Sequence, residues 1–117
     1  MAIALATTRQ TMANYYGTLG TWFGSSTGAP GTVATPANEA TGGSPAYARK
    51  QIAWVSGTGG NLSVSTPAIV DVAAGTYTHI LMCSAVSGNN MVDNADVPDV
   101  VMNNQGQLVI TPAFTIT

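Results

Sequence analysis

Charged side chains are scarce in this sequence. Only 7% of its 117 residues are charged, against about a quarter in an average soluble domain, and the net charge is −2. Three basic residues are too few to form the phosphate-neutralising patch that nucleic-acid binding needs. The negative net charge also disfavours an anionic membrane surface. The composition therefore predicts no nucleic-acid partner and no membrane partner.

Cysteine is nearly absent, and long apolar runs are missing. Cys83 is the only cysteine, so an intrachain disulfide framework cannot form. No apolar run reaches the 18 residues that a transmembrane helix needs. The start MAIALATTRQ lacks the basic region and the apolar length of a signal peptide. We therefore expect a chain that is made in the cytoplasm.

Hydrophobic residues, in contrast, are plentiful. They make up 45% of the chain, which is too many for a disordered protein. The length suffices for one domain with a core, so we expect residues 1–117 to form a single domain. Because an unpaired buried charge is costly, a surface so poor in charge suits faces that are covered in an assembly.

One helix is predicted at about residues 8–17. Thr7 and Gln10 have the spacing of a capping box, and Gly17 is a suitable C-terminal residue. Apolar side chains then recur at helical spacing: Met12, Tyr15, Tyr16 and Leu19. A helix this short is marginal alone, so we expect its Met/Tyr stripe to pack on a sheet.

The rest of the chain has the pattern of short strands and Gly-rich turns. Residues 26–45 are rich in Gly, Pro, Ala and Thr and predict a long loop, which in a compact domain is usually functional. Strands are expected across about residues 46–117, where Pro112 marks the last one as an edge or bulged strand. The expected strands are Thr21–Ser25, Ala46–Val55, 62–64, Ile69–Val72, Thr76–Ala85, Met91–Asp93 and Gln107–Ile116. The spacing predicts a mainly β fold, a β-sandwich or jelly-roll-like single domain with one short N-terminal helix.

No catalytic set is predicted. His79 and Cys83 would lie about 13 Å apart along one strand, too far for a base and its nucleophile. On that strand Tyr77, His79, Leu81 and Cys83 are expected to share one face. A nucleophile elbow G-x-S-x-G is also missing. We expect a protein that is not an enzyme and needs no cofactor.

Two weaker site hypotheses remain open. Asp93, Asp96 and Asp99 recur in DNADVPD and could hold Ca²⁺ if they cluster in a turn, or could simply be solvated turn residues. Aromatic residues could stack on a sugar, as in a carbohydrate-binding module, or could lie in the core. These are Trp22, Phe23, Tyr47 and Trp54.

The stretch Thr35–Trp54, TPANEATGGSPAYARKQIAW, resembles a segment of small structural proteins of tailed bacteriophages. Those proteins are described as head decoration, minor tail or tail-fibre proteins. The resemblance continues through ALATTRQ, TGAPGT, VDVAAGTYTHILMCSAVSG and QGQLVITPAFTIT. It implies a virion protein that binds the major capsid protein and itself, as a trimer. A minor tail or tail-fibre protein that binds the host surface is the alternative.

Contacts with partners are expected on the loop Gly28–Pro45 and the N-terminal segment Met1–Thr8. Arg49 and Lys50 are adjacent on an expected strand, so they would point to opposite faces. Each could pair with an acidic group of a neighbouring subunit or could remain solvated. The expected interaction residues are Ala29, Pro30, Pro36, Asn38, Glu39, Arg49 and Lys50.

Overall fold

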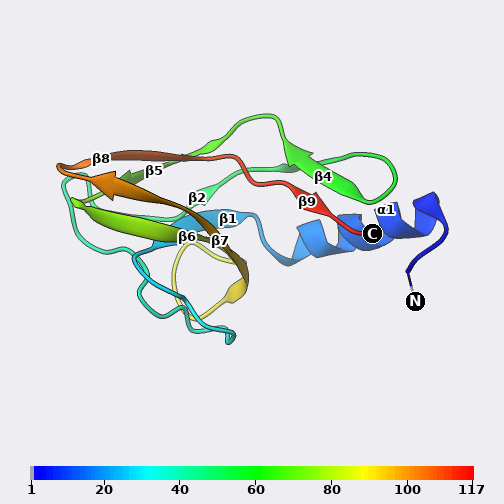
Figure 1. The fold of residues 1–117 in the computed structure, drawn as a ribbon, viewed down its shortest axis with the longest axis horizontal. Helices are drawn as coiled ribbons and strands as arrows, with labels where there is room; N and C mark the ends of the chain where they lie inside the picture. The colour runs from blue at the N-terminus through cyan, green and yellow to red at the C-terminus, as the bar shows by residue number, and fades with distance from the viewer. Residues whose placement is uncertain (1) are drawn as a thin grey trace.

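The computed structural model describes residues 2–117, and the fold is mainly β with one helix at its N-terminal end (Figure 1). Helix α1 spans Ala6–Leu19. The strands of the described residues are β1 (Trp22–Ser26), β2 (Lys50–Gln51), β3 (Trp54–Ser56), β4 (Asn61–Val64), β5 (Ala68–Val72), β6 (Gly75–Cys83), β7 (Met91–Met102), β8 (Gly106–Ile110) and β9 (Phe114–Thr115). The predicted fold class is confirmed. In residues 2–117, no helix is long and apolar enough to cross a membrane.

Three antiparallel sheets make up the β part. The first has the strand order β2-β1-β6-β7, the second β3-β4-β9, and the third β5-β8. The main core lies between the first and third sheets, where Phe23 and Met82 meet Val70, Val72 and Ile110. These side chains come from the inward positions of alternating strands, as a two-layer β fold requires.

A second, smaller cluster covers the other face of the first sheet. Leu81 and Cys83 of β6 pack there with Met91 and the partly buried Trp22. The backbone N–H of Met91 donates a hydrogen bond to Ala34 O, so the long loop lies against β7, the edge strand of this sheet. The four-stranded sheet therefore has buried side chains on both of its faces.

Helix α1 begins and ends outside its predicted limits, at Ala6 and Leu19. The predicted capping box is wrong because Leu5 is the N-cap residue and no side chain caps this end. Gln10 instead turns to the β3–β4 connection, where its Oε1 accepts hydrogen bonds from the N–H groups of Gly60 and Asn61, both at 3.0 Å. Gly17 does not end the helix.

The buried face of α1 is also different from the predicted one. Ala13 and Gly17 are its buried residues, and Tyr16 is the one member of the apolar stripe that turns inward. A Cβ on Gly17 would lie 3.1 Å from Leu62 Cδ1 and 3.2 Å from Trp54 Cδ1. The helix therefore packs through its small residues, and the rest of the predicted stripe is exposed.

The strand predicted at Ala46–Val55 is two strands in different sheets. Lys50–Gln51 pairs with β1, whereas Trp54–Ser56 pairs with β4. Between them the N–H of Ile52 donates to Thr21 O at 3.0 Å, which holds the chain as it crosses from one sheet to the next. The prediction of a single strand is wrong because the chain leaves the first sheet after Gln51 and enters the second at Trp54. The residues before Lys50 form no strand, and Tyr47 and Arg49 among them belong to the buried network described below.

An irregularity in the pairing of β6 with β7 changes the predicted face of Tyr77. The register shifts between Tyr77 and His79, so Tyr77 joins Met82 in the main core. Leu81 and Cys83 face the opposite side. The prediction that Tyr77 shares a face with Leu81 and Cys83 is wrong because the regular alternation of β6 is interrupted where its pairing with β7 shifts.

The last part of the chain departs from prediction at two places. DNADVPD lies inside the twelve-residue strand β7, paired with β6, and does not form a turn. The single strand predicted at Gln107–Ile116 is wrong, since the chain leaves β8 after Ile110 and enters β9 of another sheet at Phe114, with Pro112 between them. Each of the two strands lies at the edge of its sheet, as Pro112 predicted. The predicted loop at 26–45 is also largely confirmed, with an isolated bridge between Ser26 and Glu39.

Candidate functional site

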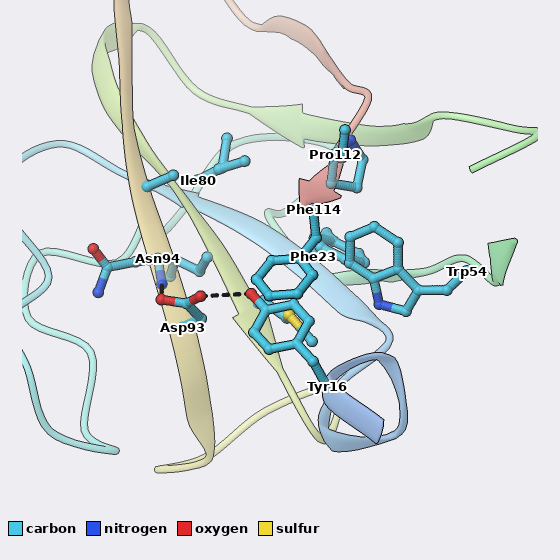
Figure 2. Close-up of a pocket in the computed structure, with 12 residues that line it drawn as sticks. Tyr16, Phe23, Trp54, Ile80, Asp93, Asn94, Pro112 and Phe114 are labelled. Carbon is cyan, nitrogen blue, oxygen red and sulfur yellow. Dashed lines mark hydrogen bonds between the residues drawn. The ribbon is translucent and has the colours of Figure 1, made fainter. Parts of the chain in front are cut away.

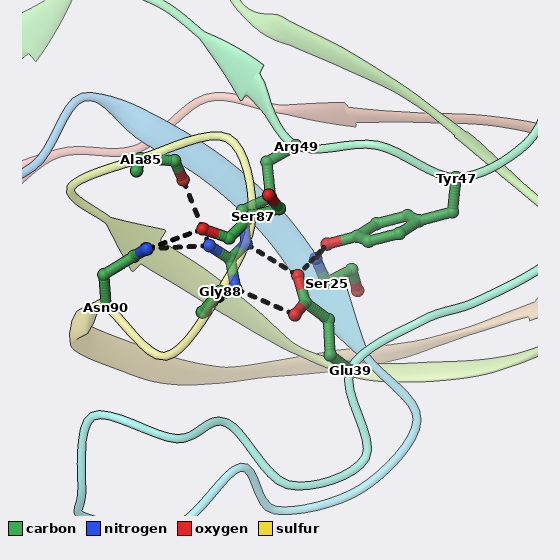
Figure 3. Close-up of polar contacts among 8 residues, drawn as sticks. All are labelled: Ser25, Glu39, Tyr47, Arg49, Ala85, Ser87, Gly88 and Asn90. Atoms are coloured by element: carbon green, nitrogen blue, oxygen red, sulfur yellow. Dashed lines mark hydrogen bonds and ion pairs between the residues drawn. The ribbon is translucent and has the colours of Figure 1, made fainter.

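The most distinctive sequence motif, NEATGGSPAYAR, folds around a buried ion pair (Figure 3). Arg49 is 2% exposed, and its Nε donates to Oε2 of Glu39 at 2.8 Å. Its Nη2 donates to Oε1 of the same carboxylate, also at 2.8 Å. The hydroxyl of Tyr47 donates a third hydrogen bond to Oε2 at 2.8 Å. Two parallel N–H···O bonds give a geometry that only a planar guanidinium provides.

The remaining donors of Arg49 hold the connection between β6 and β7. Nη1 donates to Ala85 O at 3.0 Å and to Asn90 Oδ1 at 2.8 Å, and Nη2 also donates to Gly88 O at 3.0 Å. All five N–H groups of the guanidinium are therefore used. The network ties the long loop to a turn about 40 residues later in the chain, which fixes both.

Electrostatics favours a structural role for this network. The hydrogen bond from Arg49 to Glu39 raises the pKa of the guanidinium. Burial raises the pKa of the Tyr47 phenol, and the hydrogen bond and charge of Glu39 raise it further. Both groups therefore stay protonated across the ordinary pH range. A pair that cannot exchange protons holds chain segments together and does no acid–base chemistry.

The backbone of the motif bends where small or amide residues stand. Asn38 has φ of 60°, and its Nδ2 donates to Ala29 O at 3.1 Å. Gly43 has φ of 94°, and a Cβ there would come within 2.3 Å of Gln105 Oε1. The motif is thus a folding element of the long loop, and its residues mostly serve contacts within the chain.

Some of the predicted interaction residues are buried or paired within the chain, and others are exposed. Glu39 and Arg49 are engaged with each other, which leaves neither of them free to pair with a neighbouring subunit. Pro30 is fully buried and Pro36 is half-buried, whereas Ala29, Asn38 and Lys50 are exposed. In the N-terminal segment, Met1 lies outside the described residues.

The exposed tip of the long loop comprises residues 31–35. Its base is closed by the N–H of Ala37, which donates to Pro30 O at 2.9 Å. Val33 at the tip is 66% exposed, and the tip carries no charged residue. Asn94 of β7 donates from Nδ2 to Gly31 O at 3.0 Å, so the tip rests on β7. The prediction of irregular chain here is correct, but the sequence did not reveal that the tip is held against β7 by hydrogen bonds at Gly31 and Ala34.

The predicted aromatic set is divided. Phe23 and Trp54 line a pocket of about 190 Å³ (Figure 2), whereas Trp22 packs with the smaller cluster and Tyr47 belongs to the buried network. Tyr16 stacks on Phe114 with ring centroids 3.7 Å apart, and Trp54 meets Phe23 edge-on. The Tyr16 hydroxyl donates to Oδ2 of Asp93 at 2.5 Å. Burial, with the nearby Asp93, raises the pKa of this phenol. These rings pack against one another within the chain, which favours the core interpretation over a sugar-stacking surface.

The three aspartates of DNADVPD are spread along β7. Because a strand rises about 3.3 Å per residue, Asp93 and Asp99 lie roughly 20 Å apart. Asp93 already accepts hydrogen bonds from Tyr16 and from the N–H of Asn94. Among residues 2–117, no group of three acidic, His or Cys side chains is placed to hold a metal ion. The calcium hypothesis required a turn that brings the aspartates together, and these residues lie in an extended strand.

Cys83 and His79 do not form a pair. Cys83 is fully buried, and burial raises the pKa of its thiol to about 11, so it is protonated at neutral pH. His79 Nδ1 shares a hydrogen bond with the Thr78 hydroxyl at 2.7 Å. Neither group has the environment of an activated nucleophile or its base.

The surface of the described chain carries large apolar side chains and few charges. With Glu39 and Arg49 paired, six of the eight charged residues remain for the surface. Against these stand twelve exposed large hydrophobic residues: Leu5, Met12, Tyr15, Leu19, Val33, Val55, Ile69, Val86, Val92, Val100, Val101 and Val109. Exposed apolar side chains that stand singly are normal on a soluble protein, so the scarcity of charge is the unusual property of this surface.

Comparison of the chain with protein-family models, with curated proteins and with solved structures finds no match.

Proposed function

We propose that this chain is a non-enzymatic structural protein of a tailed-bacteriophage virion. Its proposed place is the outside of the head, where it binds the major capsid protein as a decoration protein and stabilises the lattice. The proposal starts from the resemblance of the NEATGGSPAYAR segment to such proteins. It is supported by the chemistry of the surface.

The observation that carries the proposal is the exposed, uncharged tip at residues 31–35, held on a rigid base. Val33 projects from this tip, and the Glu39–Arg49 pair fixes the loop beneath it. A rigid apolar tip loses little conformational entropy on binding, so more of its burial energy contributes to affinity. An apolar tip also brings no charge that would have to be desolvated.

Regular repetition of the protein over a capsid would make weak contacts sufficient for its retention. On a capsid, each copy that touches two or more neighbours benefits from a high effective concentration after its first contact forms. A small domain with modest contacts can then be retained firmly. The role needs rigid surfaces and no reactive group.

The test is a pair of substitutions with matched exposure. Val33→Asp places a charge at the loop tip, and Val109→Asp places one at an equally exposed position on β8, since the two valines are 66% and 65% exposed. Both variants should fold with free energies of unfolding within about 0.5 kcal/mol of the original. Val33→Asp should lose retention on particles by tenfold or more, measured by quantitative gel analysis of purified virions, whereas Val109→Asp should be retained. Full retention of Val33→Asp would contradict the assignment of the tip.

A minor tail or tail-fibre protein is the second candidate. The elongated shape, 47 × 28 × 24 Å, with an apolar helix face at one end, also suits a ring of a few copies at a tail. Copy number separates the two roles. Hundreds of copies per particle support the head, whereas three or six copies support the tail.

A further inference from the structure

The pocket of Figure 2 combines aromatic walls with a single carboxylate. Tyr16 of α1, Trp54 of β3 and Phe114 of β9 line it, and Asp93 of β7 lies beside the Tyr16 hydroxyl. Its volume is about 190 Å³. Because an apolar cavity of about 150 Å³ takes up benzene, this pocket has room for a group of about six non-hydrogen atoms.

The carboxylate of Asp93 is the polar side-chain group that this pocket offers to a ligand. The hydroxyl of Tyr16 donates its proton to Asp93, and the indole N–H of Trp54 donates to a backbone carbonyl. Asn94 also lines the pocket, but its Nδ2 donates to a carbonyl of the long loop, and Figure 2 shows its side chain directed away from the rings. The side-chain donors around the pocket are therefore used, and acceptor capacity remains on the carboxylate.

The negative charge of Asp93 has no counter-ion within residues 2–117. Of the three basic residues, Arg49 is paired with Glu39, and Arg9 donates to backbone carbonyls near its own helix. Lys50 lies on β2, at the opposite edge of the sheet from β7. A group that is negative and accepts hydrogen bonds selects a ligand that is positive and donates them.

The aromatic walls favour the same kind of ligand. The ring centroids of Tyr16 and Phe114 are 3.7 Å apart, and those of Tyr16 and Trp54 are 6.4 Å apart. The faces of such rings attract a cation that comes within about 6 Å. This matters because Asp93 is exposed, and an exposed carboxylate alone holds a cation only weakly. An anion would be repelled by Asp93, and a sugar would find few partners for its hydroxyl groups.

We propose that this pocket binds an alkylammonium group, with the apolar stem between the aromatic rings and the N–H groups on the carboxylate of Asp93. Each oxygen of that carboxylate already has one partner, the Tyr16 hydroxyl or the N–H of Asn94. A compact ammonium, which needs a single contact, fits this arrangement better than a guanidinium, which takes two oxygens side by side. A lysine side chain of another protein and a small free amine share this chemistry. The inference does not depend on the virion role.

Three probes with the same butyl stem test the charge preference: n-butylammonium, n-butanol and butyrate. Amide NMR spectra of the purified chain at constant ionic strength follow the indole N–H of Trp54 and the amides of residues 93–95, with each probe added to about 100 mM. We expect saturable shifts with n-butylammonium, binding of n-butanol weaker by about tenfold or more, and no binding of butyrate. Equal affinities for n-butylammonium and n-butanol, or no saturable shift with n-butylammonium, would overturn the proposal.

A matched pair of substitutions then locates the charge. Asp93→Asn keeps an oxygen that can accept from Tyr16 and should weaken n-butylammonium binding by about tenfold or more, with n-butanol binding unchanged. Asp99→Asn removes the same charge from an exposed residue of β7 outside the pocket and should bind as the original does. The amide spectrum shows whether each variant keeps the fold, and the probe series on the original chain needs no variant. A folded Asp93→Asn chain that binds n-butylammonium as tightly as the original would overturn the proposal.

A blocked lysine, N-acetyl-lysine-methylamide, distinguishes the two sources of the ammonium group. Affinity close to that of n-butylammonium supports a lysine side chain of another protein, since the pocket then accepts the group on a peptide backbone. Binding weaker by about tenfold or more supports a small free amine, because the backbone is then excluded.

Discussion

The loop between β1 and β2 and the helix α1 differ in a way that their secondary structure does not suggest. The loop is irregular, yet Arg49 uses all five of its N–H groups to fix the loop against the rest of the chain. The helix is regular, yet three members of its apolar stripe have no cover from the chain. Rigidity follows from satisfied buried polar groups, whereas regular geometry alone does not decide where apolar surface is buried.

The chain uses its few charged residues differently in these two regions. In a chain with eight charged residues, one acid and one base are placed together inside to hold the loop. The helix, with a single arginine turned away, is left with a neutral outer face. The buried ion pair thus stabilises the loop, whereas the exposed face of the helix carries no charged side chain.

The largest expected effect is from Glu39→Ala, which breaks the anchor of the loop. The change leaves the buried guanidinium of Arg49 without its counter-ion, and such a loss typically costs about 3–5 kcal/mol. Lys50→Ala is the matched control, since Lys50 is the adjacent cation and is exposed. It should change the free energy of unfolding by less than about 0.5 kcal/mol. Chemical denaturation measures both, and equal effects would remove the distinction between the anchor and the surface.

Gly24→Ala should disturb the same anchor from the neighbouring strand. A Cβ on Gly24 would lie 2.0 Å from the hydroxyl oxygen of Tyr47, far inside contact distance. Overpacking of this kind costs about 1–3 kcal/mol. Adding Tyr47→Phe, which removes the hydroxyl, should recover part of the loss, so a double-mutant cycle should show favourable coupling. Strict additivity of the two changes would argue against the clash.

Alkaline pH should weaken the fold by a smaller amount. The pKa of the Tyr47 phenol is raised in the folded chain, chiefly by burial, so above about pH 10 the unfolded chain loses this proton first. Stability is therefore fully present below pH 10 and falls as the pH rises above it, by at most about 1.4 kcal/mol per pH unit for one group. Denaturation at pH 8, 10 and 11 measures the slope. Tyr47→Phe should reduce the slope, and an unchanged slope would show that other groups are responsible.

The smallest effect on stability is expected from Thr8→Leu on the helix side. Thr8 is exposed, so the substitution should change the free energy of unfolding by less than about 0.5 kcal/mol. Chemical denaturation measures this, with Thr18→Leu as the control at another exposed position of the helix. A large loss of stability would show that the face around Thr8 is packed within the fold.

The sequence predicted the β architecture because alternation and turn residues act locally. The alternation of Leu62 and Val64 with serines, and the edge position of the strands on either side of Pro112, are properties that a few residues determine. DNADVPD failed as a turn because its pairing with β6 outweighs the turn preference of Asp and Asn. Such pairing depends on residues that are distant in sequence.

The site was harder to predict for the same reason. Glu39 and Arg49 are ten residues apart, and the bends at Asn38, Gly42 and Gly43 bring them together. A usable signal was present, since an acid and a base within one motif of a charge-poor chain are expected to pair if they are buried. The capping box at Thr7 failed because Gln10 finds stronger partners on the β3–β4 connection. A local sequence motif does not show hydrogen-bond partners that are distant in the sequence.

The most direct measurement is the binding of the purified chain to virions that lack it, followed by a cryo-electron microscopy map of the product. The account predicts saturable binding in many copies over the head, with density of capsid subunits against Val33 at the loop tip. A chain that stays free in solution and leaves the particles bare would contradict it.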